Sequence, residues 1–451
     1  MADSRQVKAV GCRCVSDCNV VNNRQLRWVA RMLPRRNNKW YAAIEQSGLS
    51  ANNFFYTLVI VKFASIGDLG VYTFWFVVCQ FMAMLTMGLA TRQMVLEHAS
   101  KSSINQIRGL RTTCLIVLAL QAVQVALLYA FVQTYPPHGH AFLFWLALTV
   151  YCISFNFAEL FRQFYYMFSQ QRLSLYFSTI SLGCGALLFL VFAASGTSDA
   201  LELSAFWFLA SGNLFYIVCT NIKLRQRILS AGSGSESTSQ LFQRYNKHGV
   251  PATGGMLVTW MQNQSVTPLL MFMFGPVVVG YFSIARMIVT PVNMVTTGLA
   301  KSALPQIRKV YEADGHSALL SAVRGHRRIG MRTAFFYFIL VGIAVVAARF
   351  FALLQVNENL IAMLLATALV TCFSNYRFWI SQYFVVRMQF KTLLHLGIFA
   401  SCITVTIMLI GGLFFNSTLL VVTAPACGEV ILIYALSRLL VKFSESKKVE
   451  T

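Results

Sequence analysis

Long apolar segments recur along the whole chain, and short polar segments separate them. Each apolar segment holds about twenty residues or more, which lets a helix cross about 30 Å of hydrocarbon. The apolar residues are continuous rather than alternating, so they predict helices and not the strands of a barrel. The pattern predicts twelve membrane spans, at about 46–66, 70–93, 113–133, 141–165, 173–195, 203–222, 250–274, 279–304, 333–354, 358–385, 392–415 and 417–441.

Composition supports this interpretation. Hydrophobic residues make up 57% of the 451 residues and charged residues only 12%, which is about half the charged share of a soluble domain. The first apolar segment starts late and is long enough to stay in the membrane, so no cleavable signal peptide is expected. The sequence therefore predicts an all-α integral membrane protein.

The formal net charge of +22 is unevenly distributed. With an even number of spans both termini share one side of the membrane, and almost all Lys and Arg fall in the tails and loops of that side. The loops on the other side, near 134–140, 196–202 and 355–359, contain no Lys or Arg. This positive-inside pattern predicts that both termini lie in the cytoplasm. The basic excess then reflects topology and attraction to membrane lipids, so no nucleic acid partner is expected.

Two short motifs reveal an internal repeat. The sequence TMGLA and the sequence TTGLA each stand at the end of an apolar segment and before a basic one. Under one gapless shift of 210 residues the matching pairs are Thr86 with Thr296, Gly70 with Gly280, and Asn53 with Asn263. Agreement of glycines at two separated points makes coincidence a poor explanation.

The repeat predicts the organisation of the chain. Six crossings return the chain to the same side, so the halves are parallel repeats about an axis along the membrane normal. Transporters built in this way bind substrate between the halves and rock them alternately. The expected parts are a basic tail at 1–45, an N-lobe at 46–229, a Gly/Ser-rich linker at 230–249, a C-lobe at 250–441 and a tail at 442–451.

Two segments resemble the signature regions of a known superfamily. They are KFASIGDLGVYTF, which begins at Lys62, and MFGPVVVGYFSIARMIVTP, which begins at Met273. The chain is similar there to the MATE-like flippase superfamily, which includes MATE exporters, polysaccharide flippases and lipid II flippases. It most resembles the bacterial polysaccharide flippases, since lipid II flippases commonly have two further helices and multidrug exporters usually have a less basic interior. The resemblance implies two six-helix lobes that form a V-shaped central cavity.

When the basic residues at the cytoplasmic side are counted, including those at the cytoplasmic ends of spans, four basic residues remain within the membrane: Lys62, Arg286, Arg349 and Arg377. A charge within a span costs about 2.5–3.5 kcal/mol or more on insertion, so such residues usually face a cavity. Lys62 and Arg349 lie near span ends and could instead extend to the lipid headgroups. Arg286 and Arg377 lie deeper, and an arginine binds a phosphate through two parallel hydrogen bonds.

Arg286 belongs to a polar stripe on the eighth span. Helical spacing places on one face the residues Ser283, Arg286, Thr290, Asn293 and Thr297. A polar stripe in a span must face protein or water. Pro291 on the same span permits a bend.

Two other spans carry acids with two interpretations each. Glu159 and Arg162 on the fourth span could line the cavity or could neutralise each other. Glu429 on the twelfth span follows Pro425 and Gly428, and an acid beside a broken helix suits a proton or a sodium ion. It could equally be a neutral acid that forms hydrogen bonds within its lobe.

These observations define the predicted sites. The predicted substrate-binding residues are Arg286, Arg377, Lys62, Thr290, Asn293, Asn53, Asn263, Glu159 and Arg162. Glu429 is the predicted coupling-ion site, and no catalytic residue, metal ligand or cofactor is expected. The Cys12-x-Cys14-x3-Cys18 motif has neither a second cluster nor a paired His, so a basic tail is favoured over a metal site.

The predicted function is a flippase for surface polysaccharide biosynthesis. It would move an undecaprenyl-diphosphate-linked oligosaccharide across the inner membrane by alternating access, with protons or sodium ions as possible coupling ions and the polymerase and chain-length proteins of the pathway as possible partners. One alternative is a cation-coupled multidrug exporter. The other is a membrane polymerase or glycosyltransferase of the same pathway, which the short outer loops disfavour.

Overall fold

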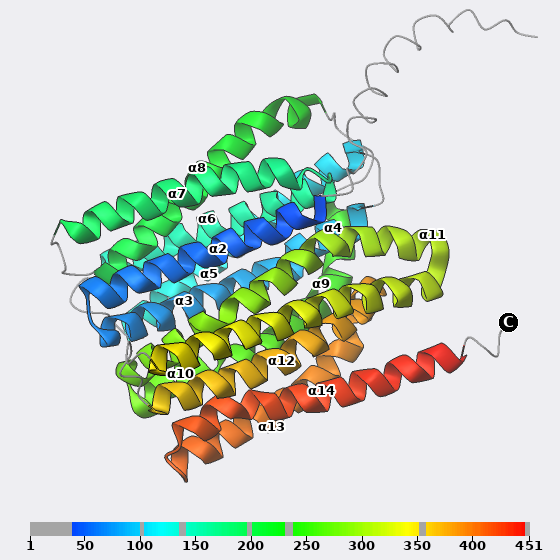
Figure 1. Ribbon diagram of the computed structural model, residues 1–451. Helices are drawn as coiled ribbons and strands as arrows, with labels where there is room; N and C mark the ends of the chain where they lie inside the picture. The colour runs from blue at the N-terminus through cyan, green and yellow to red at the C-terminus, as the bar shows by residue number, and fades with distance from the viewer. Residues whose placement is uncertain are drawn as a thin grey trace, which may run out of the picture.

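The computed structural model describes residues 38–99, 103–134, 141–195, 201–230, 238–350 and 358–446 (Figure 1). The described residues form helices and no strand. In chain order the elements are α2 (Asn38–Phe63), α3 (Ile66–Thr86), the π-helix η1 (Met87–Thr91), α4 (Arg92–His98), α5 (Ser103–Thr134), α6 (Ala141–Met167), α7 (Gln171–Ala194), α8 (Leu201–Ser230), α9 (Thr238–Gln264), α10 (Val266–Phe274), α11 (Pro276–Phe350), α12 (Glu358–Val386), α13 (Phe390–Leu413) and α14 (Thr418–Ser446).

The helices correspond to the predicted spans with three differences. α2 begins at Asn38, so it includes the last residues of the predicted N-terminal tail. The seventh span is divided into α9 and α10. The eighth and ninth spans both lie in α11, which doubles back at Gly315, where a φ of 75° suits a residue without a Cβ.

Nine helical segments of the described residues are long and apolar enough to cross a membrane, and α11 counts once among them. α2 and α9 are not among the nine, although they are the first helices of the two repeats. α2 presents polar residues to the space between the lobes, among them Gln46, Ser50 and Asn53, which lowers its hydropathy. α9 begins with the mostly polar residues 238–249 and ends at Gln264, so only its second half is apolar.

The two lobes repeat one packing plan. In the N-lobe α2 packs on α7, α6 packs on α8, and α7 packs on α8. In the C-lobe α9 packs on α13, α12 packs on α14, and α13 packs on α14, which are the equivalent pairs. The lobes meet where α11 contacts α2 and α3 and where α9 contacts α3 and η1. Figure 1 shows these central helices between the N-lobe above and the C-lobe below.

Residues related by the repeat touch each other across the lobe junction. The Ser283 hydroxyl donates a hydrogen bond of 2.9 Å to Thr73 Oγ1, and these residues are 210 positions apart. A residue can contact its own repeat equivalent only on the axis that relates the two repeats. The pair therefore marks this axis, between α3 and α11.

The matching glycines flank the same axis. A Cβ atom on Gly70 would overlap the carbonyl oxygen of Pro276, and one on Gly280 would overlap the carbonyl oxygen of Ile66. Ile66 and Pro276 are also 210 positions apart, so the two contacts are reciprocal. The repeated glycines are explained by this close approach of two backbones.

The turns after α6 and α12 extend the repeat beyond the motifs. Ser169 and Met388 both have a φ of 57°. In each turn the N–H of this residue donates to the carbonyl oxygen three positions earlier, at 3.1 Å for Ser169 and 2.9 Å for Met388, and the N–H of the following glutamine donates to the one five positions earlier. The two lobes therefore share backbone geometry outside the gapless register, because these residues are 219 and not 210 positions apart.

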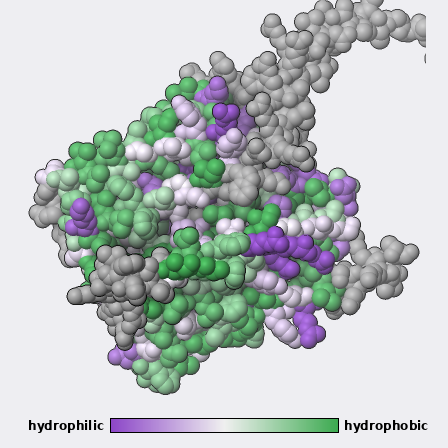
Figure 2. Space-filling view, viewed as in Figure 1, coloured by the Kyte–Doolittle hydropathy of each residue, from purple (hydrophilic) through white to green (hydrophobic). Residues whose placement is uncertain are grey.

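The outer surface suits a lipid environment. Large apolar side chains such as Leu115, Leu118, Phe336 and Leu340 are exposed on the outer helices. Figure 2 shows hydrophobic residues over most of the visible face, and hydrophilic residues gathered toward the end where α11 doubles back. α2 begins and α14 ends at this same end of the bundle (Figure 1).

Candidate functional site

A cavity of about 910 Å³ lies between the lobes. Its described lining comes from α2, α3, η1, α4 and α6 of the N-lobe and from α9, α11, α12, α13 and α14 of the C-lobe. The predicted site residues that line it are Asn53, Glu159, Arg286, Thr290, Asn293 and Arg377. A space of this size holds a ligand as large as a drug molecule or larger.

The polar stripe on α11 faces the cavity over its full length. Its five predicted members, Ser283, Arg286, Thr290, Asn293 and Thr297, all line the cavity. The Thr290 hydroxyl donates a 2.7 Å hydrogen bond to the Arg286 carbonyl oxygen. The Arg286 guanidinium forms no hydrogen bond or ion pair with any described residue. It is therefore a fixed cation in the cavity without a protein counter-ion in the described part of the chain.

Arg377 also lines the cavity, but it is not a free cation. Its Nε donates a short hydrogen bond to the carboxylate of Glu429. The sequence predicted separate roles for these residues, one for substrate and one for the coupling ion. The packing of α12 on α14 brings them together, and Glu429 is 0% exposed and lies outside the cavity lining. A buried acid requires such a partner.

Lys62 lies outside the cavity. It is exposed at the end of α2, where its ammonium lies 5.5 Å from the centre of the Phe63 ring. This position agrees with extension toward the headgroups rather than with substrate contact. The side chains of Asn263 and Arg349 lie outside the described part of the structure.

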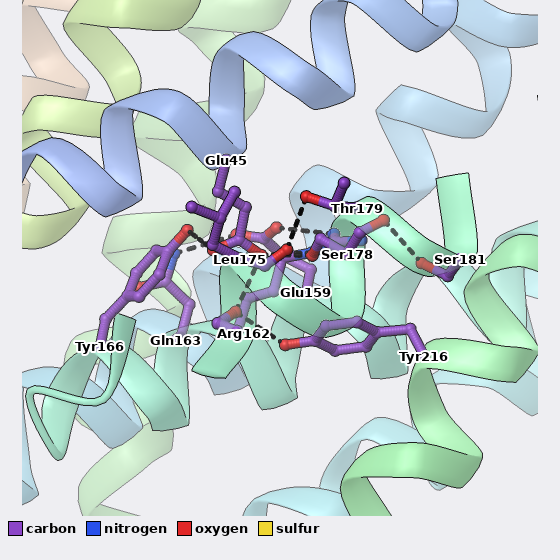
Figure 3. Close-up of polar contacts among 11 residues, drawn as sticks. Glu45, Glu159, Arg162, Gln163, Tyr166, Leu175, Ser178, Thr179, Ser181 and Tyr216 are labelled. Carbon is purple, nitrogen blue, oxygen red and sulfur yellow. Dashed lines mark hydrogen bonds and ion pairs between the residues drawn. The ribbon is translucent and has the colours of Figure 1, made fainter. Parts of the chain in front are cut away.

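Arg162 lies in a buried cluster of the N-lobe and not in the cavity lining (Figure 3). Its Nε lies 3.6 Å from Glu45 Oε1 and its Nη1 lies 3.5 Å from Glu159 Oε2. Its guanidinium also stacks over the Tyr216 ring at 5.0 Å. The predicted neutralisation of Glu159 by Arg162 is therefore present, and a second acid from α2 joins it.

Glu45 holds this cluster together. Its carboxylate accepts hydrogen bonds of 2.8 Å from both Tyr166 and Ser174, and a shorter one from Ser178. Gln163 donates to Glu159 at 2.9 Å. The cluster thus joins α2, α6, α7 and α8, and within it only Glu159 and Gln163 reach the cavity.

The sequence pattern did not single out Glu45, because it fell in the predicted tail. In the structure the buried face of α2 continues backwards from Tyr56 through Asn52 and Glu45 to Ala42. Because two of these four residues are polar, the spacing of apolar residues alone did not extend the helix to Asn38.

Arg92 is a second residue that the pattern missed. It lies at the end of the predicted span 70–93 and was counted with the basic residues of the cytoplasmic side, but at the start of α4 it lines the cavity. Its guanidinium, like that of Arg286, forms no hydrogen bond or ion pair with a described residue. Among the described lining residues Glu159 is the one acid, and it is already paired.

The described residues contain no group of three His, Cys, Asp or Glu side chains placed to hold a metal ion. The Cys12 motif lies outside the described residues.

Comparison with known proteins gives structural relatives only. No protein-family model matches the sequence, and no curated protein matches it. An outward-facing multidrug resistance MATE family transporter of the MOP superfamily shares 14% identity at a TM-score of 0.69, over 91% of this chain and 95% of that chain. The MATE multidrug transporter DinF-BH shares 15% identity at a TM-score of 0.69, over 90% of this chain and 94% of that chain.

A third structure is a MOP superfamily transporter from Pyrococcus furiosus, described as having a binding pocket of reverse polarity. It shares 11% identity at a TM-score of 0.69, over 89% of this chain and 94% of that chain. These likenesses span nearly the whole chain and confirm the expected all-helical, two-lobed architecture. The protein is a multi-pass membrane protein with the fold of the MATE transporters of the MOP superfamily.

Proposed function

We propose that this protein is a flippase for an undecaprenyl-diphosphate-linked oligosaccharide. Arg286 carries the proposal, because it is a cation in a cavity between two lobes and no described residue is its counter-ion. A desolvated guanidinium that lacks an acid partner favours an anionic ligand, and its planar fork matches phosphate oxygens. The diphosphate would bind Arg286, and translocation would follow from rocking of the lobes.

The rest of the cavity suits the sugar part of such a substrate. Neutral polar side chains from both lobes line the same cavity as Arg286, among them Asn53, Gln80, Asn156, Gln264 and Asn293. Amides and hydroxyls both donate and accept hydrogen bonds, as sugar hydroxyls do. Thr290 and Asn293 lie on the same helix face as Arg286, within reach of groups next to the diphosphate. We place the protein in the inner membrane with both termini in the cytoplasm.

Glu429 is the proposed coupling-ion site. Its carboxylate is fully buried and its Oε1 has no hydrogen-bond partner. A substrate diphosphate that attracts Arg377 would weaken the pair and leave Glu429 to bind a proton or a sodium ion. Glu429→Gln keeps an acceptor for Arg377 but removes the charge, so transport into proteoliposomes should lose its dependence on an imposed ion gradient. Gradient dependence equal to that of the unaltered protein would make Glu429 a purely structural acid.

A cation-coupled multidrug exporter is the second candidate. Two of the structural relatives are described as multidrug transporters, which favours it. The uncompensated cation at Arg286 disfavours it for cationic drugs. The Pyrococcus furiosus relative is described as having reverse pocket polarity, so this fold accommodates pockets of different charge. A polymerase or glycosyltransferase is less well supported, because the relatives of the fold are transporters.

The test is complementation in a host that lacks its own flippase for the same oligosaccharide. Arg286→Ala should abolish surface polysaccharide. Arg286→Lys should restore part of it, because a lysine keeps the charge but cannot form the two parallel hydrogen bonds of a guanidinium. Arg111→Gln, an exposed arginine on α5, is the matched control and should complement fully. Full complementation by Arg286→Ala at normal protein level would contradict the proposal, and accumulation of the lipid-linked oligosaccharide on the cytoplasmic face should accompany every inactive variant.

A further inference from the structure

One face of the return arm, residues 316–350 of α11 after the helix doubles back, is fixed to the C-lobe. Val323 and Ala334 are buried on this face. Between them Gly330 packs so closely on α12 that a Cβ would overlap the Trp379 ring. These positions fall on one side of a helix with about 3.6 residues per turn. Side chains on the opposite side of the arm therefore point away from α12.

The opposite side carries three arginines, which we call the arginine stripe. Arg324, Arg328 and Arg332 are exposed and follow one another at intervals of about one helical turn. No described residue forms a hydrogen bond or an ion pair with any of the three. The sequence has no Asp or Glu in residues 316–350, so the arm itself offers no counter-ion. The arginine stripe is therefore open to an anion from outside the described part of the chain.

The same side of the arm continues as an apolar surface. Phe335, Ile339 and Ile343 are 64%, 44% and 64% exposed. Spacings of three and four residues place them in line with Arg332 and the arginines before it. The arginine stripe and the apolar residues each extend over about 12 Å of helix. One helix face thus changes from cationic to apolar within a single turn.

This change of character locates the headgroup layer of the membrane. Figure 2 shows hydrophilic residues gathered toward the end where α11 doubles back, and hydrophobic residues over most of the visible face. Arginine favours the depth of the lipid headgroups, and apolar side chains favour the depth of the acyl chains. The arginine stripe therefore lies at the depth of the phosphate groups, and the apolar residues lie at the depth of the acyl chains.

We propose that the arginine stripe and the apolar residues beyond it bind one anionic phospholipid. Its phosphate would lie against Arg328 and Arg332, and its acyl chains would follow Phe335, Ile339 and Ile343. An acidic soluble protein would complement the arginines, but it could not reach the apolar residues at the depth of the acyl chains. A zwitterionic phospholipid would bring its own cation close to the guanidiniums. The inference does not depend on the proposed function.

The test measures which lipid lies beside position 339. The full chain with Ile339→Trp is reconstituted in phosphatidylcholine bilayers with a minor fraction of phosphatidylglycerol, and the acyl chains of one lipid at a time are brominated. Bromine quenches tryptophan fluorescence at close contact, so the difference from the protein without the added tryptophan reports the neighbouring lipid. Each arginine contact should favour the anionic lipid about fivefold. We expect phosphatidylglycerol to be preferred about fivefold to twenty-fivefold at position 339.

Three comparisons separate headgroup charge from other causes. Arg324→Gln/Arg328→Gln/Arg332→Gln should remove the preference, and the corresponding triple lysine variant should keep most of it because the charge is retained. Leu187→Trp is the control, since this exposed residue of α7 is fifteen positions from Arg172, the one Lys or Arg of that helix. It should show no preference. About 1 M NaCl should reduce the preference of the protein with its arginines, which gives a measurement that needs no arginine variant to fold.

Three outcomes would overturn the inference. The first is equal quenching by the two lipids at position 339 in the protein with its arginines. The second is a preference that survives the triple glutamine variant, because other residues would then attract the lipid. The third is weak quenching by both lipids, because a protein surface would then cover this face. None of these outcomes bears on Arg286, so the proposed function is tested separately.

Discussion

Each lobe contains a deeply buried arginine, and the two arginines are paired differently. Arg162 in the N-lobe lies between two acids, Glu45 at 3.6 Å and Glu159 at 3.5 Å. Arg377 in the C-lobe has one acid, Glu429. The N-lobe cluster also includes three hydroxyl donors to Glu45 and joins four helices, whereas the C-lobe pair joins two.

This difference shows that a repeated backbone does not imply repeated chemistry. The C-lobe arginine lines the cavity and the N-lobe arginine does not. A pair with one acid can exchange its partner for a ligand, whereas an arginine inside a closed network cannot do so without breaking several bonds. We infer that the N-lobe cluster stabilises its lobe and that the C-lobe pair is the one available to substrate.

The largest expected effect comes from the N-lobe cluster. Arg162→Met leaves Glu45 and Glu159 buried without a cation, and breaking such a network should reduce the free energy of unfolding by about 5 kcal/mol. We expect little folded protein in detergent extracts, as measured by size-exclusion chromatography. Normal yield and an unchanged unfolding midpoint would remove the distinction between the two arginines.

A smaller loss is expected in the C-lobe. Arg377→Met isolates one buried acid and should destabilise the protein by about 3 kcal/mol. The double variant Arg377→Met/Glu429→Leu should return to within about 1 kcal/mol of the original stability, because no unpaired charge remains. Thermal unfolding followed by circular dichroism measures both. A double variant as unstable as the single one would show that the pair contributes more than mutual neutralisation.

The lobe junction should behave symmetrically, in contrast to the arginines. Gly70→Ala and Gly280→Ala each introduce a Cβ that overlaps a carbonyl oxygen of the other lobe, and overpacking of this kind costs about 1–3 kcal/mol. The two variants should lower the unfolding midpoint by similar amounts. Gly183→Ala, where nothing lies within 4 Å of the added atom, is the control. Unequal shifts at the two junction sites would show that the repeat axis is only approximate.

The smallest effect concerns the hydrogen bond on the axis. Thr73→Val removes the acceptor of the 2.9 Å bond from Ser283. Ser283 retains its bond to the Val279 carbonyl oxygen, so the loss should be about 1 kcal/mol or less. A loss above about 3 kcal/mol would mean that the lobes depend on this contact to stay together.

The helical architecture could be predicted from the sequence because lipid requires long apolar helices. The repeat could be predicted from its matching glycines. Gly70 and Gly280 contact the backbone of the other lobe, so neither position tolerates a side chain and the glycine is present in both halves. The turns at Ser169 and Met388 could not be matched, because these residues are 219 positions apart and a gapless shift of 210 residues does not align them.

The site was predictable where a polar stripe is local to one helix, as at Arg286. Pairing was not predictable, because Arg377 and Glu429 are 52 positions apart and meet only through the packing of α12 on α14. Arg92 was hidden for a different reason. The letters TMGLA do not distinguish a π-turn from the α-helical TTGLA. The π-turn depends on the contact of Gly88 with α9 and on the hydrogen bond from Gln93 of α4 to Gly88 of η1, and both belong to the folded structure.

The contact of Thr73 with Ser283 has the geometry of a symmetric dimer interface within a single chain. In a dimer of identical six-helix halves, one substitution alters both sides of such a contact at once, so only self-complementary residues are tolerated there. Once the halves are fused, each side varies independently. The pairing of threonine with serine shows this freedom in use, and so do Ile66 and Pro276, which differ although each meets the equivalent glycine of the other lobe. An ancestral gene of half this length would have encoded a protein that dimerised through the surface that now joins the lobes.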